Sequence, residues 1–68
     1  KPGFDLMVKP ILIEDGVWIG AKAVVCPGVT CGVHSVLAVG SVATSNLASN
    51  SIYSGNPAIK IKDRIFDA

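Results

Sequence analysis

The sequence predicts an all-β solenoid in which the chain turns a corner every six residues. The main observation is an apolar residue at every sixth position: Ile13, Ile19, Val25, Cys31, Leu37 and Ala43. A second series, four places further on, holds smaller residues: Val17, Ala23, Val29, Ser35 and Ser41. Because helices repeat every 3.6 residues and strands every two, a sustained period of six indicates a structural repeat.

The six-residue units indicate how one coil is built. Six of them fill residues 13–48: IEDGVW, IGAKAV, VCPGVT, CGVHSV, LAVGSV and ATSNLA. We expect each to be a short strand plus a corner, so that three units close one triangular coil. The first residue of a unit then points inward, and the fifth must be small because it lies near a corner. Glycines are expected to free the backbone at the bends: Gly16, Gly20, Gly28, Gly32 and Gly40.

Two flanking segments complete the predicted organisation. Residues 1–12 carry two prolines and a glycine and are expected to be a loop leading into the first strand. Residues 49–68 leave the repeat and are expected to be a loop followed by a short C-terminal α-helix. Asn56 and Pro57 suit the N-cap and first position of that helix. Its apolar stripe would be Ala58, Ile59, Ile61, Ile65 and Phe66.

Composition narrows the class of protein. Half of the 68 residues are apolar, 16% are charged, and the net charge is +1. This balance does not favour a nucleic-acid partner, and no apolar run is long enough to span a bilayer. Two coils leave open ends, and repeat folds usually need three or more units, so we expect part of a longer polypeptide that does not stand alone as a monomer.

A β-sandwich and a cysteine-based site are the simpler alternatives. Sandwich strands follow turns at intervals of about 8–12 residues, which does not match a period of six. Cys26 and Cys31 cannot supply the four ligands of a structural zinc site, and Cys31 falls on the inward series, where a thiol packs as a small apolar group. Free thiols favour a cytoplasmic location.

Four motifs follow one another along the chain: GVWIGA at 16–21, PGVT at 27–30, AVGSV at 38–42 and GNPA at 55–58. In this order they resemble the hexapeptide-repeat acyltransferases, and more closely the C-terminal part of the maltose, galactoside and colanic-acid-type O-acetyltransferases. The resemblance implies a left-handed parallel β-helix, an exception to the usual right-handed crossover. It also implies a homotrimer with acetyl-CoA in the groove between neighbouring helices. The acceptor would be a hydroxyl of a sugar or polysaccharide precursor.

The resemblance further implies a set of cofactor contacts. Ala21 matches a residue whose backbone touches the pantetheine arm, and Val39 stands where a smaller alanine is usual. Thr44 matches a threonine near the same arm, whereas Ser45 replaces a common lysine. Basic residues after GNPA would meet the phosphates of coenzyme A: Lys62 matches one such position, Ile59 departs from another, and Lys60 or Arg64 would compensate. The alternative for these three cations is a solvated helix face.

No catalytic residue is predicted within the 68 residues. In the relatives a histidine upstream of W-I-G takes the proton from the acceptor hydroxyl, and its equivalent would precede Lys1. The single histidine, His34, is the fourth residue of its unit and is expected at an outward corner rather than in a catalytic role. Trp18 is expected to pack on a wall or against another subunit.

Two other functions are compatible with a coil of this kind. A zinc enzyme resembling the carbonic anhydrases uses three histidines, and His34 alone cannot supply them. A structural or surface-binding solenoid would carry ranks of threonine, but Thr30 and Thr44 are out of register. It also gives no role to GNPA. No metal site is therefore expected.

Overall fold

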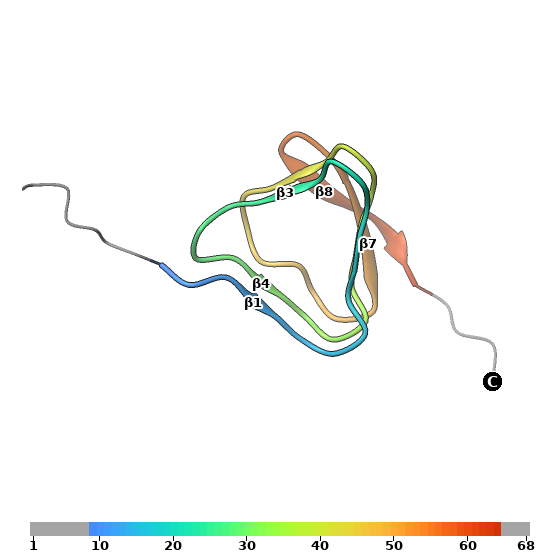
Figure 1. The fold of residues 1–68 in the computed structure, drawn as a ribbon. Coiled ribbons are helices and arrows are strands. Elements are labelled where there is room, and N and C mark those ends of the chain that lie inside the picture. The colour runs from blue at the N-terminus through green and yellow to red at the C-terminus, as the bar shows by residue number, and fades with distance from the viewer. Residues whose placement is uncertain (1–8, 65–68) are drawn as a thin grey trace, which may run out of the picture.

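The computed structural model describes residues 9–64, which form eight β-strands and no helix. Figure 1 shows the chain following the outline of a triangle. The six strands of the repeat are two residues long and each ends on an inward residue: β1 (Leu12–Ile13), β2 (Trp18–Ile19), β3 (Val24–Val25), β4 (Thr30–Cys31), β5 (Val36–Leu37) and β6 (Val42–Ala43). The predicted solenoid is confirmed.

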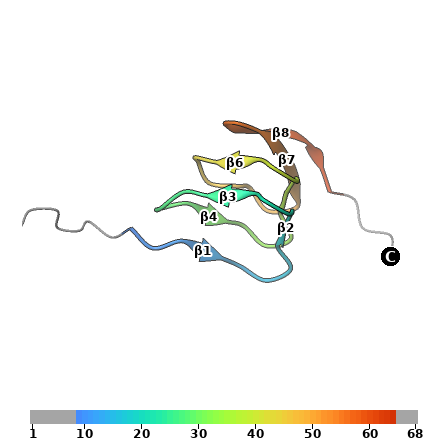
Figure 2. The ribbon, with the colours of Figure 1, turned by 45° about the horizontal axis from the view of Figure 1, so that its top comes forward.

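The strands stack into three walls. Wall one contains β1 and β4, wall two contains β2 and β5 followed by two later strands, and wall three contains β3 and β6. Neighbours within the first two coils are parallel, and Ile13 pairs with Cys31 eighteen residues further on. Figure 2 shows the coils as layers. In Figure 1 the chain runs counterclockwise from β1 while it recedes from the viewer, which makes the coil left-handed.

The interior of the coil holds the inward series. Cys31, Leu37 and Ala43 are completely buried. The fifth-position residues are small for the expected reason, since Val29, Ser35 and Ser41 are also buried at the corners. Ile13 and Ile19 belong to the first coil, which has a neighbour on one side only within residues 9–64, and they remain 54% and 38% exposed.

The corners follow a rule that the sequence only partly shows. The fourth residue of each unit from 13 to 42 has a positive φ, whether or not it is glycine: Gly16, Lys22, Gly28, His34 and Gly40. Gly20 and Gly32 have other reasons to be glycine. A Cβ on Gly20 would lie 2.5 Å from the backbone nitrogen of Val39, and one on Gly32 would lie 2.8 Å from that of Ser49. These two glycines therefore permit close approach between coils rather than a bend.

The third coil is two residues shorter than the others. Leu47, not residue 49, lies above Cys31, and Tyr53 lies above Leu37. The contraction falls between β6 and Leu47, where the side-chain Oδ1 of Asn46 accepts a hydrogen bond of 2.8 Å from the Thr30 N–H. The last predicted unit, 43–48, therefore does not have the geometry of the five before it.

The predicted C-terminal helix is wrong within the described residues. Residues 51–63 instead form an antiparallel hairpin of β7 (Ser51–Gly55) and β8 (Ala58–Asp63). In this segment apolar and basic residues alternate: Ile59, Lys60, Ile61 and Lys62. This period of two is typical of a strand, although the wider spacing of the apolar residues also fits a helix. The open edge of β7 favours the strand, because its backbone groups gain partners there.

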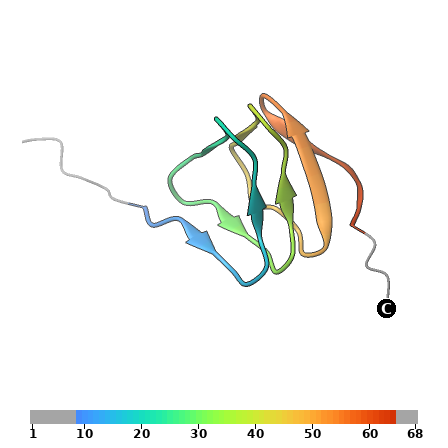
Figure 3. The same cartoon turned by 45° about the vertical axis from the view of Figure 1, so that its right-hand side comes forward.

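The turn of this hairpin contains Asn56 and Pro57, joined by a cis peptide bond, where an N-cap was predicted. Figure 3 shows β7 beside the shorter strands of wall two, with β8 beyond it. Ile65 and Phe66 lie outside the described residues. Residues 9–64 contain no helix with the length and apolarity that a membrane crossing requires.

Candidate functional site

Two of the predicted cofactor contacts lie together at the corner between walls two and three. Ala21 occupies this corner in the first coil and Val39 in the second, and the Gly40 N–H donates a 2.9 Å hydrogen bond to the Ala21 oxygen. The turn of the β7–β8 hairpin completes the same corner in the third coil, because the Gly55 N–H donates to the Ser41 Oγ at 3.0 Å. Residues 20–22, 38–40 and 55–58 are called the Ala21 corner below.

The chain makes a tight turn each time it passes this corner. The Ala23 N–H donates to the Gly20 oxygen and the Ser41 N–H to the Ala38 oxygen, both at 3.1 Å. With positive φ at Lys22 and Gly40, these turns have the pattern of type II. Within residues 9–64 the N–H groups of Ala21 and Val39 donate no hydrogen bond. Both residues are exposed, so the corner offers two backbone donors to an extended ligand with carbonyl oxygens.

The two lysines of β8 lie on opposite sides of their strand. Lys62 is opposite Ile52 and Lys60 is opposite Tyr53, with an irregularity in the pairing between them. Directly opposite residues share a face, and the extra residue of a bulge reverses the faces that follow it. Lys62 therefore shares the outer face of wall two with Ile52, Val36 and Trp18, which are paired in turn. Lys60 lies on the side of Tyr53.

Lys60 has an acidic neighbour. Its Nζ lies 2.7 Å from a carboxylate oxygen of Asp63, three residues further along β8. The hydrogen bond and the charge of Asp63 raise the pKa of Lys60. Both side chains are open to solvent, so the pair is weak. Among residues 9–64, Lys62 has no such ion pair.

The third predicted cation, Arg64, lies at a different corner. It follows β8 at the corner between walls one and two, where its backbone N–H donates to the Asn50 oxygen at 2.7 Å. One guanidinium nitrogen lies 3.2 Å from the carbonyl oxygen of His34 and 3.2 Å from that of Gly16. The guanidinium of Arg64 thus donates hydrogen bonds to backbone carbonyls of the coil.

Thr44 and Ser45 are not brought to the Ala21 corner. They follow β6 at the corner between walls three and one, in the shortened segment that contains Asn46. Both are exposed. The predicted contacts of one chain are therefore spread over three corners and β8. Ala21 and Val39 share one corner, and Thr44 and Ser45 share another.

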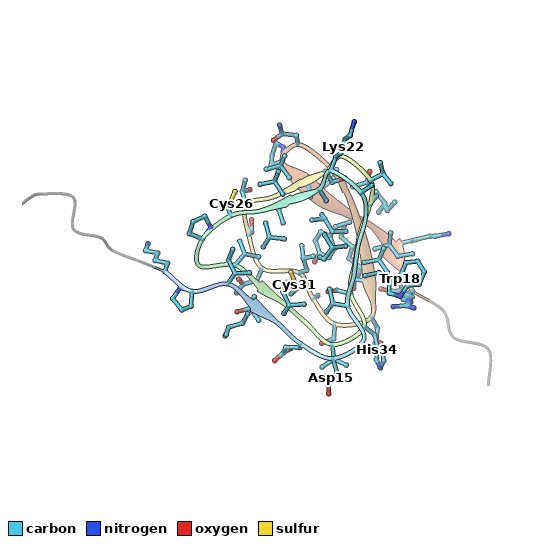
Figure 4. All side chains as sticks on the ribbon, in the orientation of Figure 1. Asp15, Trp18, Lys22, Cys26, Cys31 and His34 are labelled. Atoms are coloured by element: carbon cyan, nitrogen blue, oxygen red, sulfur yellow. The ribbon has the colours of Figure 1, made fainter. Side chains whose placement is uncertain are left out.

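His34 and Trp18 both lie on the outer side of the coil (Figure 4). His34 is at the corner below Asn50, with its imidazole over Gly16. Trp18 is 69% exposed on the outer face of wall two. Figure 4 shows both on the same side of the triangle, whereas Lys22 points away from the coil at the Ala21 corner. No group of three potential metal ligands occurs in the described part of the chain.

Sequence reasoning did not select two parts of the Ala21 corner. Lys22 follows Ala21 directly and is exposed there. The segment 55–58 was predicted as a family motif and as the start of a helix, whereas it forms the hairpin turn in the third layer of the corner. Its position depends on the two-residue contraction, because that contraction brings Gly55 level with Val39.

Comparisons with known proteins give a consistent result. No family model matches the chain. The chain is 45% identical over 53 residues to a putative acetyltransferase of Schizosaccharomyces pombe, which is 78% of this chain and 26% of that protein. It is 41% identical over 54 residues to the galactoside O-acetyltransferase of Escherichia coli K12, covering 79% and 27% of the two chains.

Solved structures agree with these relatives. A hexapeptide-repeat acetyltransferase of Vibrio cholerae, complexed with acetyl-CoA, superposes with a TM-score of 0.82 at 40% identity over 85% of this chain and 32% of that one. A galactoside acetyltransferase in complex with coenzyme A gives 0.79 at 40% identity over 81% and 28%. The chain spans about a quarter to a third of the length of these proteins. With its six-residue coils, the chain is thus similar over most of its length to one part of the hexapeptide-repeat acetyltransferases.

Proposed function

We propose that this chain forms the acetyl-CoA-binding portion of an O-acetyltransferase that acts on a sugar or polysaccharide-precursor hydroxyl. The observation that carries the proposal is the Ala21 corner, where two exposed residues one coil apart, Ala21 and Val39, have backbone N–H groups that donate no hydrogen bond within residues 9–64. The pantetheine arm of coenzyme A is extended and carries amide carbonyls, which such donors can bind. Similar proteins have been solved with acetyl-CoA or coenzyme A, which supports this choice of acyl donor.

The phosphates of the donor would be met from β8. Lys62 is the β8 lysine on the outer face of wall two, and it has no acidic partner among residues 9–64. Lys60 would contribute less, because Asp63 competes for its ammonium group at 2.7 Å. Lys22 adds a third exposed cation at the Ala21 corner itself.

The complete site would require more than one copy of the chain. A convex corner covers one side of an elongated ligand, and the predicted contacts Thr44 and Ser45 lie at another corner. In a homotrimer, two corners from neighbouring protomers can face the same groove. We propose that assembly, and a cytoplasmic location in keeping with the free thiols of Cys26 and Cys31.

The chemical step would be direct acyl transfer. The acceptor oxygen attacks the thioester carbonyl, a C–O bond forms, the C–S bond breaks, and the thiol of coenzyme A leaves with a proton supplied by the base. Backbone N–H groups would stabilise the intermediate oxyanion. We propose no part in this proton transfer for His34, whose imidazole lies against Gly16. The base is therefore proposed to lie outside these 68 residues.

Titration calorimetry with coenzyme A and acetyl-CoA tests the binding function, and chromatography of galactoside or maltose incubations tests transfer. We expect weak binding of both donors and no product from the 68-residue chain alone. Absence of binding would refute the proposal. Product formation that disappears in His34→Ala would instead show that the base is in this chain. Sedimentation analysis of the same sample tests the trimer.

A further inference from the structure

Arg64 connects all three coils along one corner. The corner column contains Gly16, His34 and Asn50, each with positive φ and each at the start of its pass along wall two. The Arg64 N–H donates to the Asn50 oxygen, and its guanidinium donates to the oxygens of His34 and Gly16. One residue at the end of β8 thereby contacts the first, second and third layers of the stack.

These contacts suit an arginine. The terminal guanidinium nitrogen carries two N–H groups and lies one bond further along the side chain than a lysine ammonium nitrogen, and the group stays charged. The two carbonyl oxygens belong to successive coils, and each is 3.2 Å from the same guanidinium nitrogen. Hydrogen bonds from a charged donor are stronger than neutral ones. Arg64 therefore fastens the end of β8 to the body of the coil.

The attachment of β8 by Arg64 is important because Lys62 lies two residues before Arg64. β8 is the last strand of wall two and pairs with β7 along one edge only within residues 9–64. Lys62 lies near the end of that strand, after the irregularity in its pairing. A strand held along one edge and disturbed by a bulge frays from its end unless a further contact restrains it.

We infer that Arg64 is a positioning residue for the donor phosphates: it does not bind them, but holds the end of β8 so that Lys62 does. This inference rests on the proposed function, and it assigns a different role to each of the three cations that were predicted to meet the phosphates. Lys62 contacts phosphate. Lys60 binds phosphate less strongly because it is paired with Asp63. Arg64 holds β8 in place through its hydrogen bonds to backbone carbonyls.

The test compares Arg64→Lys with wild type in the full chain, and uses Lys60→Gln as a matched control on the same strand. Arg64→Lys keeps the charge but shortens the side chain by one atom, so that its nitrogen reaches the two carbonyl oxygens less well. We expect it to lower the unfolding midpoint by about 4–8 °C. We also expect about tenfold faster hydrogen exchange of the β8 N–H groups. Lys60→Gln should change neither, because its ion pair is exposed. These readouts do not depend on coenzyme A.

A double-mutant cycle then separates positioning from direct contact. Lys62→Gln should weaken coenzyme A binding about threefold, and Arg64→Lys by a similar factor. The double variant should bind no more weakly than Lys62→Gln alone, because Arg64 acts through Lys62. Multiplied losses, or unchanged β8 exchange in Arg64→Lys, would overturn the inference. If wild type does not bind coenzyme A but the exchange result holds, the proposed function fails while the attachment of β8 stands.

Discussion

The imidazole of His34 lies directly over the α-carbon of Gly16, the residue at the same corner one coil earlier. A Cβ built on Gly16 would lie 2.5 Å from Cε1 of the ring and 3.1 Å from Cγ. The His34 N–H also donates to the Asp15 oxygen at 2.9 Å, so backbone and side chain together fix this stacking. Gly16 is thus required for two reasons, its φ of 72° and the space that the ring occupies.

This contact predicts that two similar glycine substitutions lower the free energy of unfolding by different amounts. Gly40 has a φ of 69° but nothing within 4 Å of its virtual Cβ. Gly40→Ala should therefore cost about 1–2 kcal/mol of unfolding free energy, from backbone strain alone. Gly16→Ala should cost more, because the ring must also move. Denaturant unfolding of both variants measures the difference. In a His34→Ala background the two costs should become equal, and a persistent gap would show that the ring is not the cause.

Ser35 predicts a stabilising substitution. Its side chain is fully buried, and its Oγ has no hydrogen-bond partner among residues 9–64. Ser35→Ala should raise the free energy of unfolding by about 1 kcal/mol, because a buried hydroxyl without a partner is costly. Ser41→Ala is the matched control and should lower stability, since the Ser41 Oγ accepts from the Gly55 N–H. A loss of stability in Ser35→Ala would mean that this hydroxyl is satisfied in solution.

The two cysteines should differ in reactivity and in their effect on stability. Burial raises the pKa of the Cys31 thiol above the ordinary 9.0, whereas Cys26 is partly exposed. Iodoacetamide should therefore modify Cys26 first, and peptide mass spectrometry identifies the site. Because the unfolded thiol ionises at lower pH than the folded one, the contribution of Cys31 is complete below about pH 9 and falls as pH rises further. Cys31→Ala should lack this component of the pH dependence, and an identical profile would contradict it.

The proposed donor contacts can be tested by removing single N–H groups. Pro27 already occupies the second position of a corner turn, where the Val29 N–H donates to the Cys26 oxygen. Ala21→Pro and Val39→Pro place proline at the equivalent positions and should weaken coenzyme A binding about threefold to tenfold, the value of one hydrogen bond. Val33→Pro makes the same change at the His34 corner and should leave binding unchanged. Equal losses in all three variants would indicate a general disturbance of the coil.

The regular part of the fold could be predicted from the sequence because it depends on one apolar position in every six residues. Leu37 and Cys31 are buried at the places that the period assigns. The hairpin could not be predicted in the same way. Ile59-Lys60-Ile61-Lys62 fits a strand, while the wider spacing of Ala58 and Ile61 fits a helix. The choice depends on the unpaired edge of β7, which is a property of the tertiary structure.

The candidate site was predictable to a similar extent. Ala21 and Val39 are eighteen residues apart, so the period itself brings them to one corner. The position of the turn at 55–58 depends instead on the shortened third coil, where Leu47 replaces residue 49 in the interior. Arg64 could not be distinguished from Lys62 by composition, because its contacts are backbone oxygens far away in sequence.

The antiparallel direction of β8 has a consequence for the behaviour of the molecule in concentrated solution. Stacked coils of parallel strands end in open backbone edges, and such an edge can recruit another chain and grow into a fibre. On wall two the chain reverses at Gly55 and covers the edge of β7 with a strand that carries Lys60, Lys62 and Asp63. Charged residues on an edge strand discourage further pairing. The hairpin thus protects this wall of the solenoid against end-to-end polymerisation.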